Sequence, residues 1–122
     1  MQYMLLIYSA EQEWAHLSDE ERNAIVREYF ALSDELREKG AYVAGAPLQP
    51  TSTATTVRVR AGEHVTTDGP FAETKEQLGG YFLIDADSAE EALEWAARIP
   101  AARYGSIEVR PVLPVPAEAP AG

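Results

Sequence analysis

Two short apolar runs, residues 3–8 and residues 81–84, constrain the fold more than any other part of the sequence, and each has the length of a β-strand. Neighbouring side chains of a strand point to opposite faces of a sheet. Both runs are apolar at odd and at even positions, so both faces of each strand are apolar. Such strands are expected to lie inside a sheet that is covered on both sides.

A helix is predicted after each run. Ser18 and Glu21, and likewise Ser88 and Glu91, have the spacing of a capping box, in which each serine hydroxyl and each glutamate carboxylate accepts from the other residue's backbone amide. Gly40 is placed to end the first helix in a left-handed conformation, and a proline stops the second. The expected buried positions are Ile25, Tyr29, Leu32 and Leu36, widened by Val26 and Phe30, in the first helix, and Ala92, Leu93, Ala96 and Ile99 in the second.

Four further strands are predicted. Residues 56–60 alternate between polar and apolar side chains, and a glycine turn separates them from residues 64–67. The two segments are expected to form a hairpin. Residues 41–46 form a short strand after the first helix, and residues 106–112 form the last strand. Pro111 places this last strand at an edge of the sheet, because proline cannot donate to a ladder.

The resulting order, without the hairpin, is strand, helix, strand, strand, helix, strand. The predicted fold class is therefore α+β, with a ferredoxin-like βαββαβ domain and an inserted β-hairpin. A chain of 122 residues is expected to form one domain, which we assign to residues 1–113. The Pro- and Ala-rich tail, residues 114–122, is predicted to be disordered.

Both right-handed crossovers of this fold place their helices on the same face of the sheet. Nothing of sufficient size is left in one chain to cover the opposite apolar face. Two sheets packed face to face would bury it, and an apolar face of this size is an association site. The sequence therefore predicts a homodimer through sheet faces, an assembly of the dimeric α/β-barrel type.

Composition narrows the classes of function. The net charge of -10 argues against direct binding of nucleic acid, which needs clustered Lys and Arg, and against anionic membrane surfaces. No signal peptide or membrane-spanning run is recognised, so the expected location is the cytoplasm. The chain has no cysteine, and neither His16 nor His64 has a second ligand at metal spacing. No cofactor and no metal are indicated.

The segment from Asp68 to Glu76 is the strongest candidate for a functional site. It combines a Gly-Pro turn, one aromatic residue and four charged residues immediately before the apolar run 81–84. Asp68 could bond to nearby backbone amides, as aspartates in turns do, or could serve as a catalytic carboxylate at the mouth of a cleft. His16, in the loop expected before the first helix, is an alternative general base.

The other candidate residues would bind a ligand. Phe71 and Tyr81 would supply an apolar wall. Lys75 and Arg110 would hold an anionic group, since an arginine fork suits a planar oxyanion, although Arg110 could equally pair with Glu108. The charged residues Glu73 and Glu76 either flank this ligand or form an ordinary solvated run.

Five separated segments together resemble the DGPF branch of the YCII-related proteins. They are residues 3–8, residues 68–76, Gly80-Tyr81-Phe82, residues 92–96 and residues 107–112. The resemblance covers residues 2–112 and implies a ferredoxin-like domain that dimerises through its sheets, with no established reaction.

Better-studied relatives outside this branch are proposed to be enzymes because they carry a His and an Asp in a cleft near the first helix. Tyr29 occupies the position that resembles this His, so that activity does not carry over, and Tyr29 becomes a further ligand-binding candidate. The resemblance also implies a link to sigma factors of the extracytoplasmic-function type. Three hypotheses follow: a small-molecule-binding protein or enzyme, a non-catalytic regulatory interaction module, and a scaffold dimer.

Overall fold

β1 (Gln2–Ser9) lies inside a four-stranded antiparallel sheet whose strand order is β2-β5-β1-β6. The computed structural model describes residues 1–119. β5 (Gln77–Asp85) and β6 (Ser106–Pro111) flank β1, and β2 (Tyr42–Pro47) forms the other edge. This α+β arrangement is compatible with the ferredoxin-like order. The prediction of Pro111 on an edge strand is confirmed.

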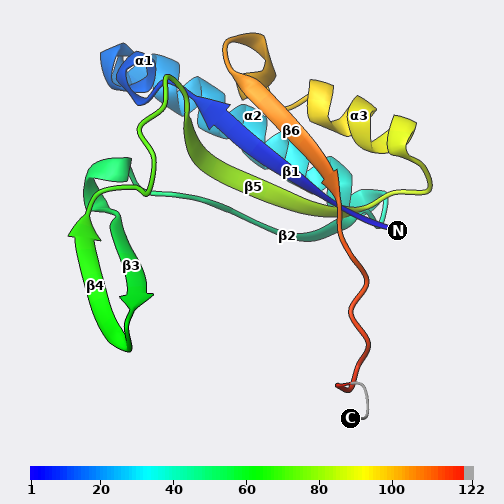
Figure 1. The fold of residues 1–122 in the computed structure, drawn as a ribbon. Coiled ribbons are helices and arrows are strands. Elements are labelled where there is room, and N and C mark those ends of the chain that lie inside the picture. Colours follow the sequence, from blue (N-terminus) through cyan, green and yellow to red (C-terminus); the bar gives the residue numbers. More distant parts are fainter. Residues whose placement is uncertain (120–122) are drawn as a thin grey trace.

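The helices cover one face of this sheet (Figure 1). α2 (Asp19–Glu38) follows β1, and α3 (Ala89–Ala97) follows β5. Between them and the sheet lies a single core, in which Leu5, Leu36 and Ile84 are almost fully buried. Truncating a leucine at such a position costs about 2–5 kcal/mol of stability. No helix within residues 1–119 has both the length and the apolar character needed to cross a membrane.

The capping box at the start of α2 is confirmed in full. The Ser18 hydroxyl accepts from the Glu21 amide at 3.1 Å, and the Glu21 carboxylate accepts from the Ser18 amide at 3.0 Å. The hydrogen bond from the Ser18 backbone amide, with a smaller effect of the Ser18 side chain, holds the pKa of the Glu21 carboxyl below its usual range. Gly40 has φ +69° just after the helix, as predicted.

The capping box at the start of α3 is only half formed, which corrects the prediction. The Ser88 hydroxyl accepts from the Glu91 amide at 3.2 Å, but the Glu91 carboxylate accepts from the amide of Asp87 at 2.9 Å. The Glu91 carboxylate satisfies one free backbone amide in either case, that of Ser88 in a full capping box or that of Asp87 here. The sequence pattern therefore did not distinguish the two arrangements.

The predicted buried faces of the helices were drawn too wide. Val26 and Phe30 of α2 and Leu93 of α3 are exposed, whereas Trp95 of α3 is buried. Successive helical residues are about 100° apart, so Leu93 lies beside the stripe that Ala92 begins and not within it. Trp95 faces the core together with Ala92.

A short helix, α1 (Glu11–His16), occupies a segment that was expected to be a loop. Its N-cap is Ala10, whose side chain makes no capping bond, so the sequence lacks the usual signal of a helix start. Two 3₁₀ turns complete the connections: η1 (Thr51–Thr53) precedes β3, and η2 (Pro100–Arg103) precedes β6.

β3 (Thr55–Arg60) and β4 (Glu63–Asp68) form a separate two-stranded antiparallel sheet between β2 and β5 in the chain. In Figure 1 this hairpin stands apart from the four-stranded sheet and its helices. The segment after β6 runs away from the sheet, and residues 112–119 form neither helix nor strand. The rest of the predicted disordered tail, residues 120–122, lies outside the described residues.

The face of the four-stranded sheet opposite the helices is apolar and partly exposed; we call it the open face. Its members share the side of the sheet that points away from the core and are half-buried on the two inner strands. They are Met4, Leu6 and Tyr8 of β1, Tyr81 and Leu83 of β5, Ala44 and Ala46 of β2, and Glu108 and Arg110 of β6. No described element covers these side chains, as the two-faced strands predicted.

Candidate functional site

The turn that follows β4 is held by its backbone. Gly69 has φ +100°, a conformation that favours glycine, and its amide donates to the Ala54 carbonyl at 2.7 Å. The Thr56 hydroxyl donates to the Gly69 carbonyl at 2.8 Å. Asp68 is exposed beside this turn, and the hydrogen bonds that fix the turn within residues 1–119 do not use its carboxylate.

The loop after the turn, residues 70–76, leads along the end of the sheet to β5. Phe71 is 82% exposed, and Glu73 is exposed as well. Near β5 the loop becomes anchored: the Thr74 hydroxyl donates to the Glu76 carbonyl. The Glu76 carboxylate accepts from the Ser106 hydroxyl at 2.8 Å, which ties the loop to the start of β6.

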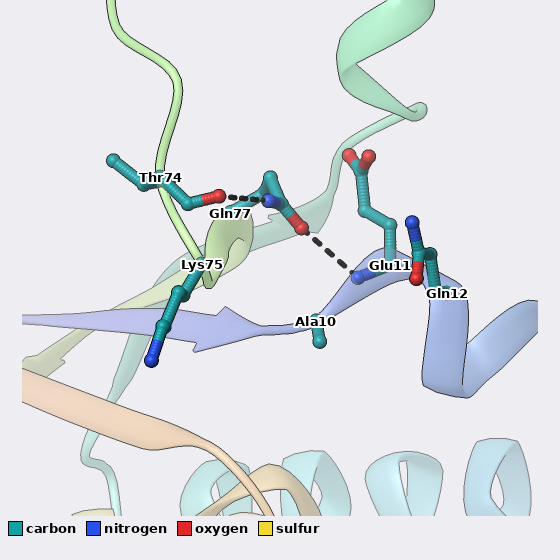
Figure 2. A pocket seen from close by; sticks show the side chains of 6 residues that line it. All are labelled: Ala10, Glu11, Gln12, Thr74, Lys75 and Gln77. Atoms are coloured by element: carbon teal, nitrogen blue, oxygen red, sulfur yellow. Dashed lines mark hydrogen bonds between the residues drawn. The ribbon is translucent and has the colours of Figure 1, made fainter.

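Gln77 joins this loop to α1. Its Nε2 donates to the Thr74 carbonyl at 2.6 Å, and its Oε1 accepts from the Glu11 amide at 3.0 Å. Figure 2 shows the amide of Gln77 between these two partners. One neutral side chain therefore satisfies a free amide at the start of α1 and fixes the end of the loop, which explains how an uncapped helix of six residues is held.

A hollow of about 280 Å³ lies where the loop, β5 and α1 meet. It is bounded by polar and small side chains from these three segments (Figure 2). They are Ala10, Glu11, Gln12, Thr74, Lys75 and Gln77. The hollow thus lies beside the charged segment that the sequence singled out, at the Lys75 end and not at the Asp68 end.

The two charged residues of the hollow are in different states. The Glu11 carboxylate accepts from the Thr51 amide at 2.7 Å and from the Thr51 hydroxyl at 2.9 Å, which fixes it on η1. Lys75 is exposed and takes part in none of the ion pairs found among residues 1–119. In Figure 2 the two charged ends point in opposite directions. The Lys75 ammonium is therefore not neutralised by Glu11, the other charged residue of the lining.

Tyr81 and Arg110 lie elsewhere, on the open face of the sheet. Tyr81 is opposite Leu6, and Arg110 is opposite Met4 near the far end of β1. Ser106 is the residue of β6 that binds Glu76 of the loop. Arg110 is four residues further along this strand, which is roughly 13 Å. Arg110 and Glu108 point to the same face, as predicted, but they form none of the ion pairs among the described residues.

Tyr29 lies on the helix side of the sheet, where its ring stacks on Phe82 with 6.3 Å between centroids. Burial, with a smaller effect of Tyr104, raises the pKa of Tyr29 to about 12. Burial also raises the pKa of Tyr104. The neighbouring Arg103 pairs with Glu28 at 2.7 Å and lowers the pKa of that carboxyl.

The candidate residues of the sequence are therefore distributed over three places: the loop and its hollow, the open face, and the helix layer. Only Lys75 lines the hollow, with Glu76 next to it in the chain. His16 lies exposed on α1 and is not part of its lining. Sequence reasoning missed Glu11, Gln12 and Gln77, which no motif marks. The only sequence signal for any of the three was that Gln77 directly follows the charged segment.

The chain is a small α+β protein with a polar hollow at one end of its main sheet. The family model of the YCII-related domain matches residues 1–116. The chain therefore belongs to the YCII-related family. It is also 43% identical over 114 residues to an uncharacterized protein of Rhizobium meliloti (strain 1021), covering 92% of each chain.

Proposed function

We propose that this YCII-related protein binds a small anionic metabolite in the hollow beside the 70–76 loop. The observation that carries the proposal is Lys75, a cation without an ion pair among residues 1–119 that lines the hollow together with Gln12 and Gln77. An ammonium group supplies three donors to an oxyanion, and the amide of Gln12 adds a neutral polar group, whereas the amide of Gln77 is bound to Thr74 and Glu11. The class of ligand that fits best is a small carboxylate.

The size of the hollow supports a ligand of a few heavy atoms. At about 280 Å³ it lies near the lower end of the range for ligand pockets, about 300–1,000 Å³. A second hollow, of about 290 Å³, at the start of β1 is lined by Lys39 and by Met1 with its N-terminal ammonium, but these two cations are outnumbered by three acids, Asp85, Asp87 and Glu91. Those carboxylates disfavour an anion there, so the hollow at Lys75 is the better anion site.

Acid–base catalysis by Asp68 and an apolar wall of Phe71 and Tyr81 are finer parts of the sequence prediction, and none of these three residues lines the hollow. Asp68 is outside the lining of the hollow, so its carboxylate would reach only a ligand that extends along the loop. Assignment to the DGPF branch is likewise proposed from the sequence, as is the interpretation of the hairpin β3–β4 as an insertion in a ferredoxin-like fold. The sigma-factor association depends on the resemblance alone and stays a prediction.

The proposed assembly is a homodimer in which two open faces pack against each other. The apolar centre formed by Leu6, Tyr81 and Leu83 supports it, because these side chains are half-buried with no described element over them. Glu108 and Arg110 lie at the edge strand of the same face. In a two-fold arrangement the acid of one copy can meet the base of the other.

Lys75 can be observed almost in isolation, because the chain has only two lysines, Lys39 and Lys75. Reductive methylation with ¹³C-formaldehyde keeps the lysine charge and gives each lysine its own NMR signal. Titration with a panel of small mono- and dicarboxylates is expected to shift the Lys75 signal in a saturable way and leave the Lys39 signal in place.

Lys75→Met is expected to abolish binding of the carboxylate that gives this shift, measured by calorimetry on unmethylated protein. Lys39→Met is the matched control and should bind as the wild type does. If no carboxylate shifts Lys75, or if both lysines shift alike with ionic strength, anion binding in this hollow is wrong.

A further inference from the structure

The hollow beside the 70–76 loop is lined by two side chains of opposite charge, Lys75 and Glu11, and otherwise by neutral residues. Neither charged residue takes part in the ion pairs found among residues 1–119. The lining therefore has no net charge, but it contains one cation and one anion that the described part of the chain leaves unpaired.

Glu11 is held in place although it has no cationic partner among these residues. It is half-buried, and each of its carboxylate oxygens accepts one hydrogen bond from Thr51, at 2.7 Å from the amide and at 2.9 Å from the hydroxyl. An ionised carboxylate offers about four acceptor sites. Acceptor sites therefore remain for a further donor, and the neutral Thr51 fixes the carboxylate without neutralising its charge.

Lys75 presents its charge from the other side of the hollow. Its side chain is exposed, and its ammonium is a compact charge with three donors on a flexible stem. In Figure 2 the charged ends of Lys75 and Glu11 point in opposite directions. A ligand that meets both charges must therefore be extended and must carry its own charged groups at its two ends.

The two unpaired charges select among small carboxylates. A ligand with one carboxylate and no other charge pairs with Lys75 but leaves Glu11 without a cation. A dicarboxylate brings a second negative charge toward the fixed Glu11 carboxylate, and like charges repel. An ammonium at the far end of the ligand replaces this repulsion by a charge-assisted hydrogen bond. A ligand with one negative and one positive end thus satisfies both residues at once.

We infer that the ligand of this hollow is a small ω-amino carboxylate, a zwitterion whose carboxylate binds Lys75 and whose ammonium binds Glu11. The inference rests on the proposed binding of a carboxylate at Lys75 and names the class of carboxylate. It makes Glu11 a specificity-determining residue, which accepts an ammonium group and rejects a second carboxylate.

The first test compares three ligands of equal length, valerate, δ-aminovalerate and glutarate, which differ only in the group at the far end. Calorimetry on the unmodified full chain is expected to give at least about tenfold higher affinity for δ-aminovalerate than for valerate, the usual effect of one added charged hydrogen bond. Glutarate is expected to bind more weakly than valerate. The pairs γ-aminobutyrate with butyrate and ε-aminocaproate with caproate extend the comparison to shorter and longer chains.

Glu11→Gln provides the second test, because it removes the charge and keeps a side-chain oxygen that can accept from Thr51. The affinity for δ-aminovalerate is expected to fall about tenfold, whereas the affinity for glutarate is expected to rise at least about twofold. A general loss of structure would weaken both ligands alike. Glu13→Gln, at an exposed position of α1 outside the lining, is the matched control and should leave both affinities within about twofold.

The possible failures are distinguishable. Equal affinities of the wild type for valerate and δ-aminovalerate, or a Glu11→Gln variant that weakens glutarate as much as δ-aminovalerate, would overturn the zwitterion and the role of Glu11. Carboxylate binding at Lys75 would still stand in either case. If none of the three ligands binds, carboxylate binding at this hollow is itself wrong, and the inference that rests on it is wrong as well.

Discussion

The side-chain oxygen of Gln77 accepts a hydrogen bond of 3.0 Å from the backbone amide of Glu11, 66 positions earlier in the chain. This bond joins the loop side of the hollow to its helix side. The same amide group donates to the Thr74 carbonyl. Gln77 therefore couples three of the segments that surround the hollow, although it carries no charge.

Gln77→Ala is expected to lower the free energy of unfolding by about 1 kcal/mol, the usual net value for a lost hydrogen bond of this kind. It should also speed hydrogen exchange in α1 and in residues 74–76. Chemical denaturation and exchange mass spectrometry measure these effects. Gln49→Ala, at an exposed position, serves as the control. Unchanged exchange in α1 would show that the helix does not depend on Gln77.

Leu83→Glu is expected to convert the proposed homodimer to a monomer, because it places a charge at the centre of the open face. Leu93→Glu makes the same change on the outer side of α3, where the side chain is already 55% exposed, and should not alter the assembly. Light scattering over a range of concentrations measures the mass. A wild-type chain that stays monomeric at all of them would contradict the homodimer.

Tyr29→Phe is expected to reduce the loss of stability at alkaline pH. The folded-state pKa of Tyr29 is raised to about 12 by burial, above the ordinary value of about 10. The stabilisation is therefore complete below pH 10 and is lost as the pH rises from about 10 to 12. By pH 12 the loss amounts to roughly 2 kcal/mol. Urea unfolding at pH 9 to 12 measures it, and parallel curves for variant and wild type would contradict the assignment.

Asp68→Asn is expected to change little. The side chain is exposed and outside the lining of the hollow, so the free energy of unfolding should stay within about 0.5 kcal/mol. The affinity for the carboxylate found with Lys75 should change by less than about twofold, measured by calorimetry. A folded variant that no longer binds this ligand would place Asp68 in the binding site and restore the case for acid–base chemistry.

The fold was predictable where the local sequence pattern and the burial of the element in the folded chain favour the same structure. The alternation in β3 and the two-faced runs of β1 and β5 gave their strands to within a few residues, and the Ser18 capping box gave the start of α2. Leu93 and Trp95 show the limit of such reasoning. Both are large and apolar, and only the direction from which the sheet approaches α3 decides which of them is buried.

The hollow was less predictable, because its walls come from segments far apart in the chain. Lys75 belonged to a recognisable charged motif, but Glu11 and Gln12 sit in a helix that has no capping signal. Gln77 acts through a bond to a backbone amide, which any residue can supply and no motif marks. Asp68 and Lys75 were grouped by sequence, whereas the loop separates the Asp68 turn from the hollow that Lys75 lines.

Both edge strands of the main sheet finish in a proline, Pro47 in β2 and Pro111 in β6. A proline has no amide hydrogen to offer a neighbouring strand, so each border is a poor template for lateral growth. Association through the open face would stop at two copies, because each copy covers the open face of the other. Association through a border could continue without end. The two borders of the main sheet are therefore built to resist extension into fibrils, and the proposed pairing through the open face would stay limited to two copies.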